Sequence, residues 1–196
     1  MAEPWIDDAS VTVEQALSQK IAIIGEKLSI RRFEKVSAAD GVVASYIHGG
    51  GKIGVLAVLE TSASGDAVSE CGKNVAMQVA ALNPKYVTRD EVPADFVEHE
   101  KEILKTAAMN ENPNKPENII DKMIIGCLNK ELKEICLVDQ AYVKDGDLSV
   151  KKYVDSVAKE VGAAITVKSF VRYQTGEGIE KREDDFAAEV AKQAGM

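Results

Sequence analysis

A glycine-rich segment that ends in a lysine is the first feature of this sequence that could do chemistry. Gly49-Gly50-Gly51-Lys52-Ile53 has the composition of a phosphate-binding loop. That loop, however, needs four residues between its glycines and a Ser or Thr after the lysine to hold magnesium, and Ile53 occupies that place. We therefore predict a tight turn between two strands. Gly176-Glu177-Gly178 lacks the third glycine of a dinucleotide-binding fingerprint in the same way.

Nucleophilic catalysis has no better support in the sequence. No Gly-x-Ser-x-Gly elbow is present, and neither histidine has a Ser or Cys partner at motif spacing. Two Ser-x-x-Lys matches, Ser149 to Lys152 and Ser156 to Lys159, fall in one predicted helix without their companion motifs. A small hydrolase or transferase therefore lacks a catalytic constellation, and we predict that the chain is not an enzyme with catalytic residues.

The cysteines and histidines are too few and too scattered for a metal centre. Cys71, Cys127 and Cys136 form no Cys-x-x-Cys pair, and His48 and His99 stand at no ligand spacing from them. One thiol is left over from any pairing, which is typical of a reducing compartment. We predict no metal and no cofactor.

Charge and hydropathy limit the class of partner and the location. The 24 Lys and Arg against 32 Asp and Glu leave a net charge of −8, which disfavours direct nucleic-acid binding. No apolar run reaches the length of a membrane span, and the N-terminus lacks the pattern of a signal peptide. These features predict a soluble, cytoplasmic protein that does not bind membranes.

The first half of the chain has clear helix and strand periodicities. Apolar residues at three- and four-residue steps predict a helix over 12–26, with Thr12 and Gln15 as a capping box. Period-two alternation predicts strands over 28–36, 42–48 and 53–59, with the glycine-rich turn between the last two. Three successive strands favour an antiparallel meander.

The second half is mainly helical. Helices are predicted from Gly65 to Asn83, from Pro93 to about Asn110 and over about 119–132, the last two forming an antiparallel hairpin. A helix capped by Ser149, a strand over 163–173 and a tail helix over 184–193 follow. No fixed-period repeat is visible. Strands and helices in separate runs predict an α+β fold, with small antiparallel sheets packed by helices and an inserted helical hairpin.

Two positions could contact a partner. His48 ends a strand at the glycine-rich turn, where its imidazole either reaches a partner or bonds to its own loop. Ile24 and Gly25 end the first predicted helix, where they either offer an apolar contact or only cap the helix. The residues alone leave both alternatives open.

Several ordered blocks resemble one family, bacterial elongation factor Ts, the guanine-nucleotide exchange factor of elongation factor Tu. The likeness spans residues 12–193. Its blocks are Ile23-Ile24-Gly25-Glu26 with Ile30-Arg31-Arg32, Ser45-Tyr46-Ile47-His48-Gly49 with Ile53-Gly54-Val55-Leu56, Val75-Ala76-Met77-Gln78-Val79-Ala80 with Pro84, and Phe170-Val171-Arg172-Tyr173 through Gly176-Glu177-Gly178-Ile179-Glu180-Lys181 to Asp185-Phe186-Ala187-Ala188-Glu189-Val190.

The resemblance implies a dimerisation domain with two small-sheet subdomains, a coiled-coil insertion and a C-terminal module. It divides the chain into five parts: an N-terminal extension or truncation point (1–11), the first helix with the antiparallel strands and the following helix (12–92), the helical hairpin (93–135), the helix and strand that complete the second sheet (136–180), and the C-terminal module (181–196). It also implies that Ile24, Gly25, His48 and Gly49 contact elongation factor Tu, that Phe186 belongs to a docking helix, and that exchange needs no covalent chemistry. A homodimer is a further expectation.

One departure from the family affects the expected activity. Family members carry an additional N-terminal helical domain and a Thr-Asp-Phe-Val loop that wedges near the GTPase magnesium. Neither is found in this sequence, since Ala94-Asp95-Phe96-Val97 lies at the start of a predicted helix with Phe96 on its apolar stripe. We therefore expect a fragment of such a factor. It either promotes GDP release or is an interaction domain with little exchange activity of its own.

Overall fold

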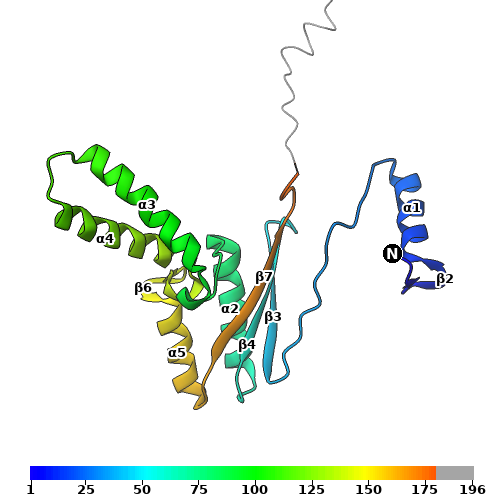
Figure 1. The fold of residues 1–196 in the computed structure, drawn as a ribbon. Helices are drawn as coiled ribbons and strands as arrows, with labels where there is room; N and C mark the ends of the chain where they lie inside the picture. The colour runs from blue at the N-terminus through cyan, green and yellow to red at the C-terminus, as the bar shows by residue number, and fades with distance from the viewer. Residues whose placement is uncertain (180–196) are drawn as a thin grey trace, which may run out of the picture. The chain divides into compact units, whose positions relative to one another are not determined.

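The computed structural model describes residues 1–179 (Figure 1), and the chain divides into two compact units, the first ending at Lys35 and the second beginning at Val36. Both units combine helices with small antiparallel sheets, so the predicted α+β class is confirmed. The predicted division into five segments is not tested by this partition.

The first unit is a short hairpin followed by one helix. Strands β1 (Pro4–Trp5) and β2 (Asp8–Thr12) pair antiparallel and lead directly into α1 (Val13–Ile24). The predicted capping box is present, because the Thr12 hydroxyl accepts the Gln15 amide at 3.2 Å while the Gln15 carboxamide accepts the Thr12 amide at 2.8 Å. Gly25 ends α1 in the left-handed region at φ 79°, and its N–H donates to the Ile21 carbonyl.

The strand predicted over 28–36 is wrong. Residues 28–35 belong to no strand of the part of the chain that the structure describes. Period-two alternation identifies which side chains share a face, but a strand also needs a neighbouring backbone to accept and donate its hydrogen bonds. The predicted three-strand meander fails for the same reason.

The sheet of the second unit takes its third strand from much later in the chain. Strands β3 (Gly41–His48) and β4 (Ile53–Glu60) form the predicted hairpin, and β7 (Thr166–Gln174) pairs antiparallel with the other edge of β4. The order is therefore β3-β4-β7, with a register shift on β4 between Val58 and Leu59. The central strand β4 is also the most buried of the three.

Two helices cover one face of this sheet (Figure 1). Helix α2 (Asp66–Leu82) lies against β3 and β4 at short range, because a Cβ built on Gly72 would be 2.7 Å from the Ala44 Cβ. Helix α5 (Val150–Val161) packs on α2, and its N-cap Ser149 accepts the Lys152 amide as predicted. The main core joins both helices to β4 and the first half of β7.

The predicted helical hairpin is confirmed. Helix α3 (Ala94–Glu111) follows the 3-10 turn η1 (Arg89–Glu91), and α4 (Glu117–Ile135) lies alongside it and precedes the 3-10 turn η2 (Leu137–Asp139). Helix α4 buries Ile120, Ile124 and Leu128 at four-residue steps, whereas α3 buries no residue fully. Whether the pair acts as a coiled coil remains a prediction.

The same hairpin and helix occur a second time, which the sequence analysis missed. Strands β5 (Ala141–Tyr142) and β6 (Asp145–Ser149) pair with the register of β1 and β2 and run into α5 as β2 runs into α1. The matching pairs are Pro4 with Thr12 and Trp5 with Asp8 in one copy, and Ala141 with Ser149 and Tyr142 with Asp145 in the other. Both helices span equal lengths and end at a left-handed glycine, Gly25 and Gly162.

The tail helix predicted over 184–193 lies outside the described residues. Among the helices that are described, none combines the length and the hydropathy needed to cross a membrane.

Candidate partner-binding surfaces

The end of α1 presents an exposed apolar corner. Ile24, its last residue, is 54% exposed, and the preceding Ile23 is 78% exposed. Gly25 turns the chain at positive φ, and a Cβ built on it would meet no atom within 4 Å. A cap contact that hid Ile24 was the alternative interpretation, but an isoleucine this exposed stays accessible to another protein.

The tip of the β3–β4 hairpin is a second exposed point. His48 pairs with Ile53 at the end of β3, and Gly49, Gly50 and Gly51 follow it at positive φ. Three glycines in succession leave the backbone of the turn without side chains, so that another polypeptide can approach it closely. The tight turn predicted here is thus present.

A tyrosine on the same strand orients the His48 ring. The Tyr46 hydroxyl lies 3.1 Å from His48 Nδ1, and the two ring centroids are 5.9 Å apart. His48 therefore bonds to its own strand and is also exposed, so its contact with a partner stays a prediction. The contact uses Nδ1 and leaves Nε2 to meet a partner.

One neighbour of His48 was missed by the sequence analysis. Ile47 is 72% exposed and points to the opposite face of β3, because successive strand residues alternate between faces. The signal that could have identified it is an apolar residue next to the end of a strand that leads into three glycines. The hairpin tip thus offers both a polar and an apolar side.

The two exposed points lie on different units. Ile24 and Gly25 belong to the first unit, and His48 and Gly49 belong to the second. Phe186, the remaining candidate, lies outside the described residues. All four candidates inside the described part are exposed.

Phe96 occupies a structural position. It lies in the first turn of α3 as predicted, it is half-buried, and the Lys85 ammonium sits 5.4 Å from its ring centroid. A cation over an aromatic face stabilises the start of the hairpin modestly. The Ala94-Asp95-Phe96-Val97 segment is therefore helical in this chain.

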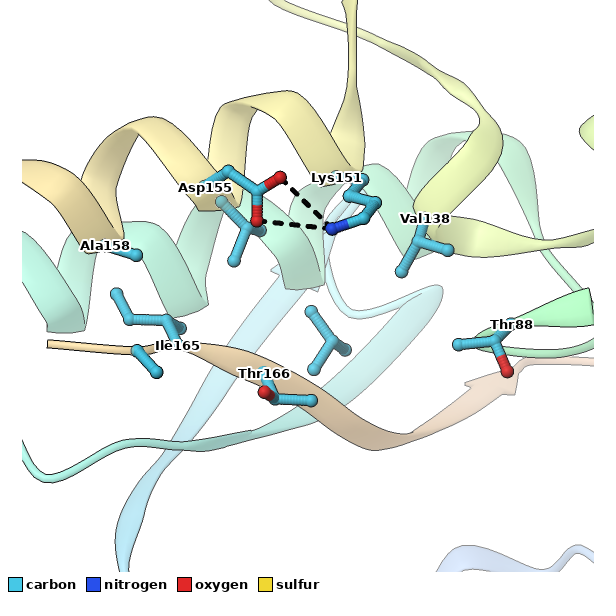
Figure 2. Close-up of a pocket in the computed structure, with 10 residues that line it drawn as sticks. Thr88, Val138, Lys151, Asp155, Ala158, Ile165 and Thr166 are labelled. Carbon is cyan, nitrogen blue, oxygen red and sulfur yellow. Dashed lines mark hydrogen bonds and ion pairs between the residues drawn. The ribbon is translucent and has the colours of Figure 1, made fainter. Parts of the chain in front are cut away.

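A groove lies between α5 and the start of β7 (Figure 2). It encloses about 370 Å³, with Val138, Ala158 and Ile165 among its walls. At its edge, the Lys151 ammonium lies 3.1 Å from the Asp155 carboxylate, one helical turn away, and each charge offsets the other. The groove offers apolar contact area more than reactive groups.

The thiols are separate and mostly hidden. Cys71 and Cys136 are buried, Cys127 is exposed, and all three are free. Burial raises the pKa of Cys71 to about 11, so its thiol stays protonated and unreactive near neutral pH. Within residues 1–179, no three His, Cys, Asp or Glu side chains gather where a metal ion could bind.

Comparison with known proteins gives the same family that the ordered sequence blocks resemble. The family model described as Elongation factor TS matches residues 2–177. The chain belongs to the elongation factor Ts family. A curated relative, Elongation factor Ts of Clostridioides difficile strain 630, is 56% identical over 183 residues, which are 93% of this chain and 59% of that protein.

Two other relatives give the same result. Elongation factor Ts of Clostridium perfringens strain SM101 is 50% identical over 96% of this chain and 61% of its own length. Elongation factor Ts of Clostridium botulinum strain ATCC 19397 is 49% identical over 98% of this chain and 62% of its own length. The chain thus spans about 60% of the length of these relatives.

Proposed function

We propose that this chain binds elongation factor Tu and promotes the release of GDP from it without covalent chemistry. Membership of a family of translation elongation factors supports the proposal. The single observation that carries it is the exposure of all four described contact candidates, two at a helix end and two at a hairpin tip. A cytoplasmic location and a protein partner instead of a nucleic acid are part of the proposal, as suits a net charge of −8.

The two points act through shape. Ile24 supplies apolar area next to a glycine that allows the partner close to the helix end. His48 supplies a ring nitrogen held in place by Tyr46, next to an uncovered backbone. If the bound chain lowers the affinity of elongation factor Tu for GDP, linkage requires that bound GDP lowers the affinity of elongation factor Tu for the chain by the same ratio.

The test is the rate at which elongation factor Tu releases a fluorescent GDP when the chain is added. Ile24→Ala and His48→Ala are each expected to lower the apparent affinity about ten-fold, as for a contact worth about 1.4 kcal/mol. Ile103→Ala is the matched control for the first, because Ile103 is 48% exposed on α3. His99→Ala, the other exposed histidine, is the control for the second.

The two control variants distinguish the loss of a direct contact with elongation factor Tu from a general effect of the substitution on the chain. Binding that is equally weakened by the α3 variants, or unaffected by Ile24→Ala and His48→Ala, would contradict the assignment of these surfaces. Absence of any binding at micromolar concentration would contradict the proposed partner itself.

A second candidate is binding with little exchange. It is favoured by the helical setting of Phe96, whose half-buried ring lies under Lys85 and does not form a wedge loop. Titration calorimetry beside the release assay distinguishes the two: heat of binding with an unchanged rate of GDP release supports the interaction domain, and acceleration supports the exchange factor. Sedimentation of the chain alone tests the expected homodimer.

A further inference from the structure

Tyr46 is anchored in the molecule, whereas the His48 ring that it contacts is not. The Tyr46 ring is half-buried and packs against the main core, and its neighbour on β4, Val55, is only 3% exposed. His48, two residues further along β3, belongs to the same face of the strand but is exposed. A tyrosine with a packed ring holds its hydroxyl at a defined place. The Tyr46 hydroxyl is therefore a fixed point for the exposed imidazole.

The contact between the two side chains also determines which ring nitrogen of His48 carries the proton. The Tyr46 hydroxyl lies 3.1 Å from His48 Nδ1, and within residues 1–179 it has no other hydrogen-bond partner. A phenol O–H is a better donor than a neutral imidazole N–H, and an imidazole nitrogen is a better acceptor than a phenol oxygen. The hydroxyl therefore donates to Nδ1. Because a neutral imidazole carries one proton, that proton is then on Nε2.

The surroundings of His48 leave the Nε2–H open to another protein. His48 precedes Gly49, Gly50 and Gly51, which all have positive φ, and a Cβ built on Gly50 or Gly51 would meet no atom within 4 Å. Among the residues that the structure describes, only the Tyr46 hydroxyl is hydrogen-bonded to the His48 ring. The hairpin tip thus offers one oriented donor beside a backbone that no side chain covers.

We propose that Tyr46 is a positioning residue for His48, and that His48 donates from Nε2 to an oxygen acceptor of elongation factor Tu. This inference rests on the proposed function, since it names the chemistry of the group that the hairpin tip meets. A donor that is held in place before binding raises affinity, because less side-chain freedom is lost when the complex forms. A partner that presents an N–H group or an ammonium at this point would meet a donor and be rejected.

The first measurement uses the full chain without its partner. Long-range proton–nitrogen correlation spectra, at a pH where histidine is neutral, should show His48 Nδ1 as the unprotonated nitrogen and Nε2 as the protonated one. Tyr46→Phe should move both His48 signals toward a mixture of the two tautomers, while the signals of His99 stay unchanged. A proton on Nδ1 in the unaltered chain, or His48 signals insensitive to Tyr46→Phe, overturns the assignment.

The second measurement is the affinity for elongation factor Tu in the GDP-release assay. Glutamine places an amide N–H near the position of Nε2, whereas asparagine places it near that of Nδ1. His48→Gln should therefore lower the affinity about three-fold or less, and His48→Asn should lower it about ten-fold, as His48→Ala does. Equal losses in the two amide variants, or a larger loss in His48→Gln, overturn the assignment of Nε2.

The third measurement tests whether Tyr46 acts through His48. Tyr46→Phe should lower the affinity about three- to ten-fold in the unaltered chain and have no further effect once His48→Ala is present, because coupled residues are not additive. Tyr86→Phe, at another half-buried tyrosine, is the matched control and should leave the affinity unchanged. Thermal unfolding of Tyr46→Phe at the midpoint of the unaltered chain shows that the fold is intact.

The outcomes separate this inference from the function on which it rests. An equal loss from Tyr46→Phe with and without His48→Ala overturns the positioning role, because Tyr46 then acts independently of His48. Absence of binding by the unaltered chain contradicts the proposed function and the acceptor on elongation factor Tu. The nitrogen spectra need no partner, so they decide the role of Tyr46 in either case.

Discussion

Residues 4–35 and residues 141–174 share a hairpin register, a capped helix and a left-handed glycine, yet only the second stretch ends in a paired strand. The local signals are strong enough in both copies to form the hairpin and the helix. The strand differs, since β7 has the edge of β4 beside it. Turns and helices form from nearby residues, whereas a strand requires a partner that lies elsewhere in the sequence.

The largest expected difference between the copies is in the unfolding free energy lost when a charge is placed on the inner face of the helix, α5 in one copy and α1 in the other. Val150→Asp puts a carboxylate at a position with 0% exposure, and we expect the second unit to lose about 3 to 5 kcal/mol of unfolding free energy. The same change at its counterpart, Val13→Asp, should cost about 1 kcal/mol or less, because Val13 is only half-buried. Urea denaturation monitored by hydrogen exchange measures the loss of unfolding free energy in each variant. Equal losses would contradict the comparison.

A smaller effect is expected from a hydrogen bond that only the second copy has. The Asn74 amide donates to the Tyr153 hydroxyl at 2.7 Å beneath the stacked Tyr142 ring, whereas the counterpart of Tyr153 is Ala16. Tyr153→Phe leaves the buried Asn74 amide without this partner and should cost about 1 to 3 kcal/mol in thermal unfolding.

The double variant Tyr153→Phe with Asn74→Leu supplies the control for that result. Removing both polar groups should recover most of the loss, because no buried donor is then left unsatisfied. A double variant as unstable as Tyr153→Phe alone would assign the cost to packing instead.

The N-caps of α1 and α5 are expected to contribute similar free energies to their own helices. Their removal should nevertheless affect the unfolding of the second unit differently. Ser149→Ala and Thr12→Ala each remove an N-cap worth about 1 kcal/mol. Ser149→Ala should lower the unfolding midpoint of the second unit, whereas Thr12→Ala should only speed hydrogen exchange within α1. A lower midpoint of the second unit in Thr12→Ala would show that the two units unfold together.

Alkaline pH should affect the second unit alone, with no effect near neutrality. Burial raises the pKa of the Cys71 thiol from 9.0 to about 11 and also raises the pKa of Cys136, while residues 1–35 contain neither Cys nor Tyr. Above pH 9 the unfolded thiols lose protons that the folded ones keep, so stability falls as pH rises from 9 toward 11. Denaturation at stepped pH should show this slope, and Cys71→Ala should reduce it. An unchanged slope in that variant would assign the effect to Cys136 or to the tyrosines.

Most local elements could be predicted from the sequence. The helices were found by their periodicity, and two starts were found by their caps at Thr12 and Ser149. The glycine-rich turn was distinguished from a phosphate loop by the spacing of its glycines and by Ile53. The strand over 28–36 and the meander were wrong, because alternation does not say which distant strand will pair.

The candidate contact surfaces were predicted more by family resemblance than by residue chemistry. His48 and Ile24 carry no motif, and only the structure shows that both are exposed and that Tyr46 holds the His48 ring. Ile47 was missed because an apolar strand residue is usually assigned to a core. Their roles in binding remain a prediction.

By itself, the sequence determined the β3–β4 hairpin, the helical hairpin, the capped helices and the class of the fold, since caps, turns and periodicity act within a few residues of each other. Only the tertiary structure decided that β7, and not residues 28–35, completes the sheet. It also revealed that one hairpin and helix recur, because only the register and the caps are shared. Pairing between distant strands depends on a free edge at the right place, and that edge exists only after the rest of the chain has packed.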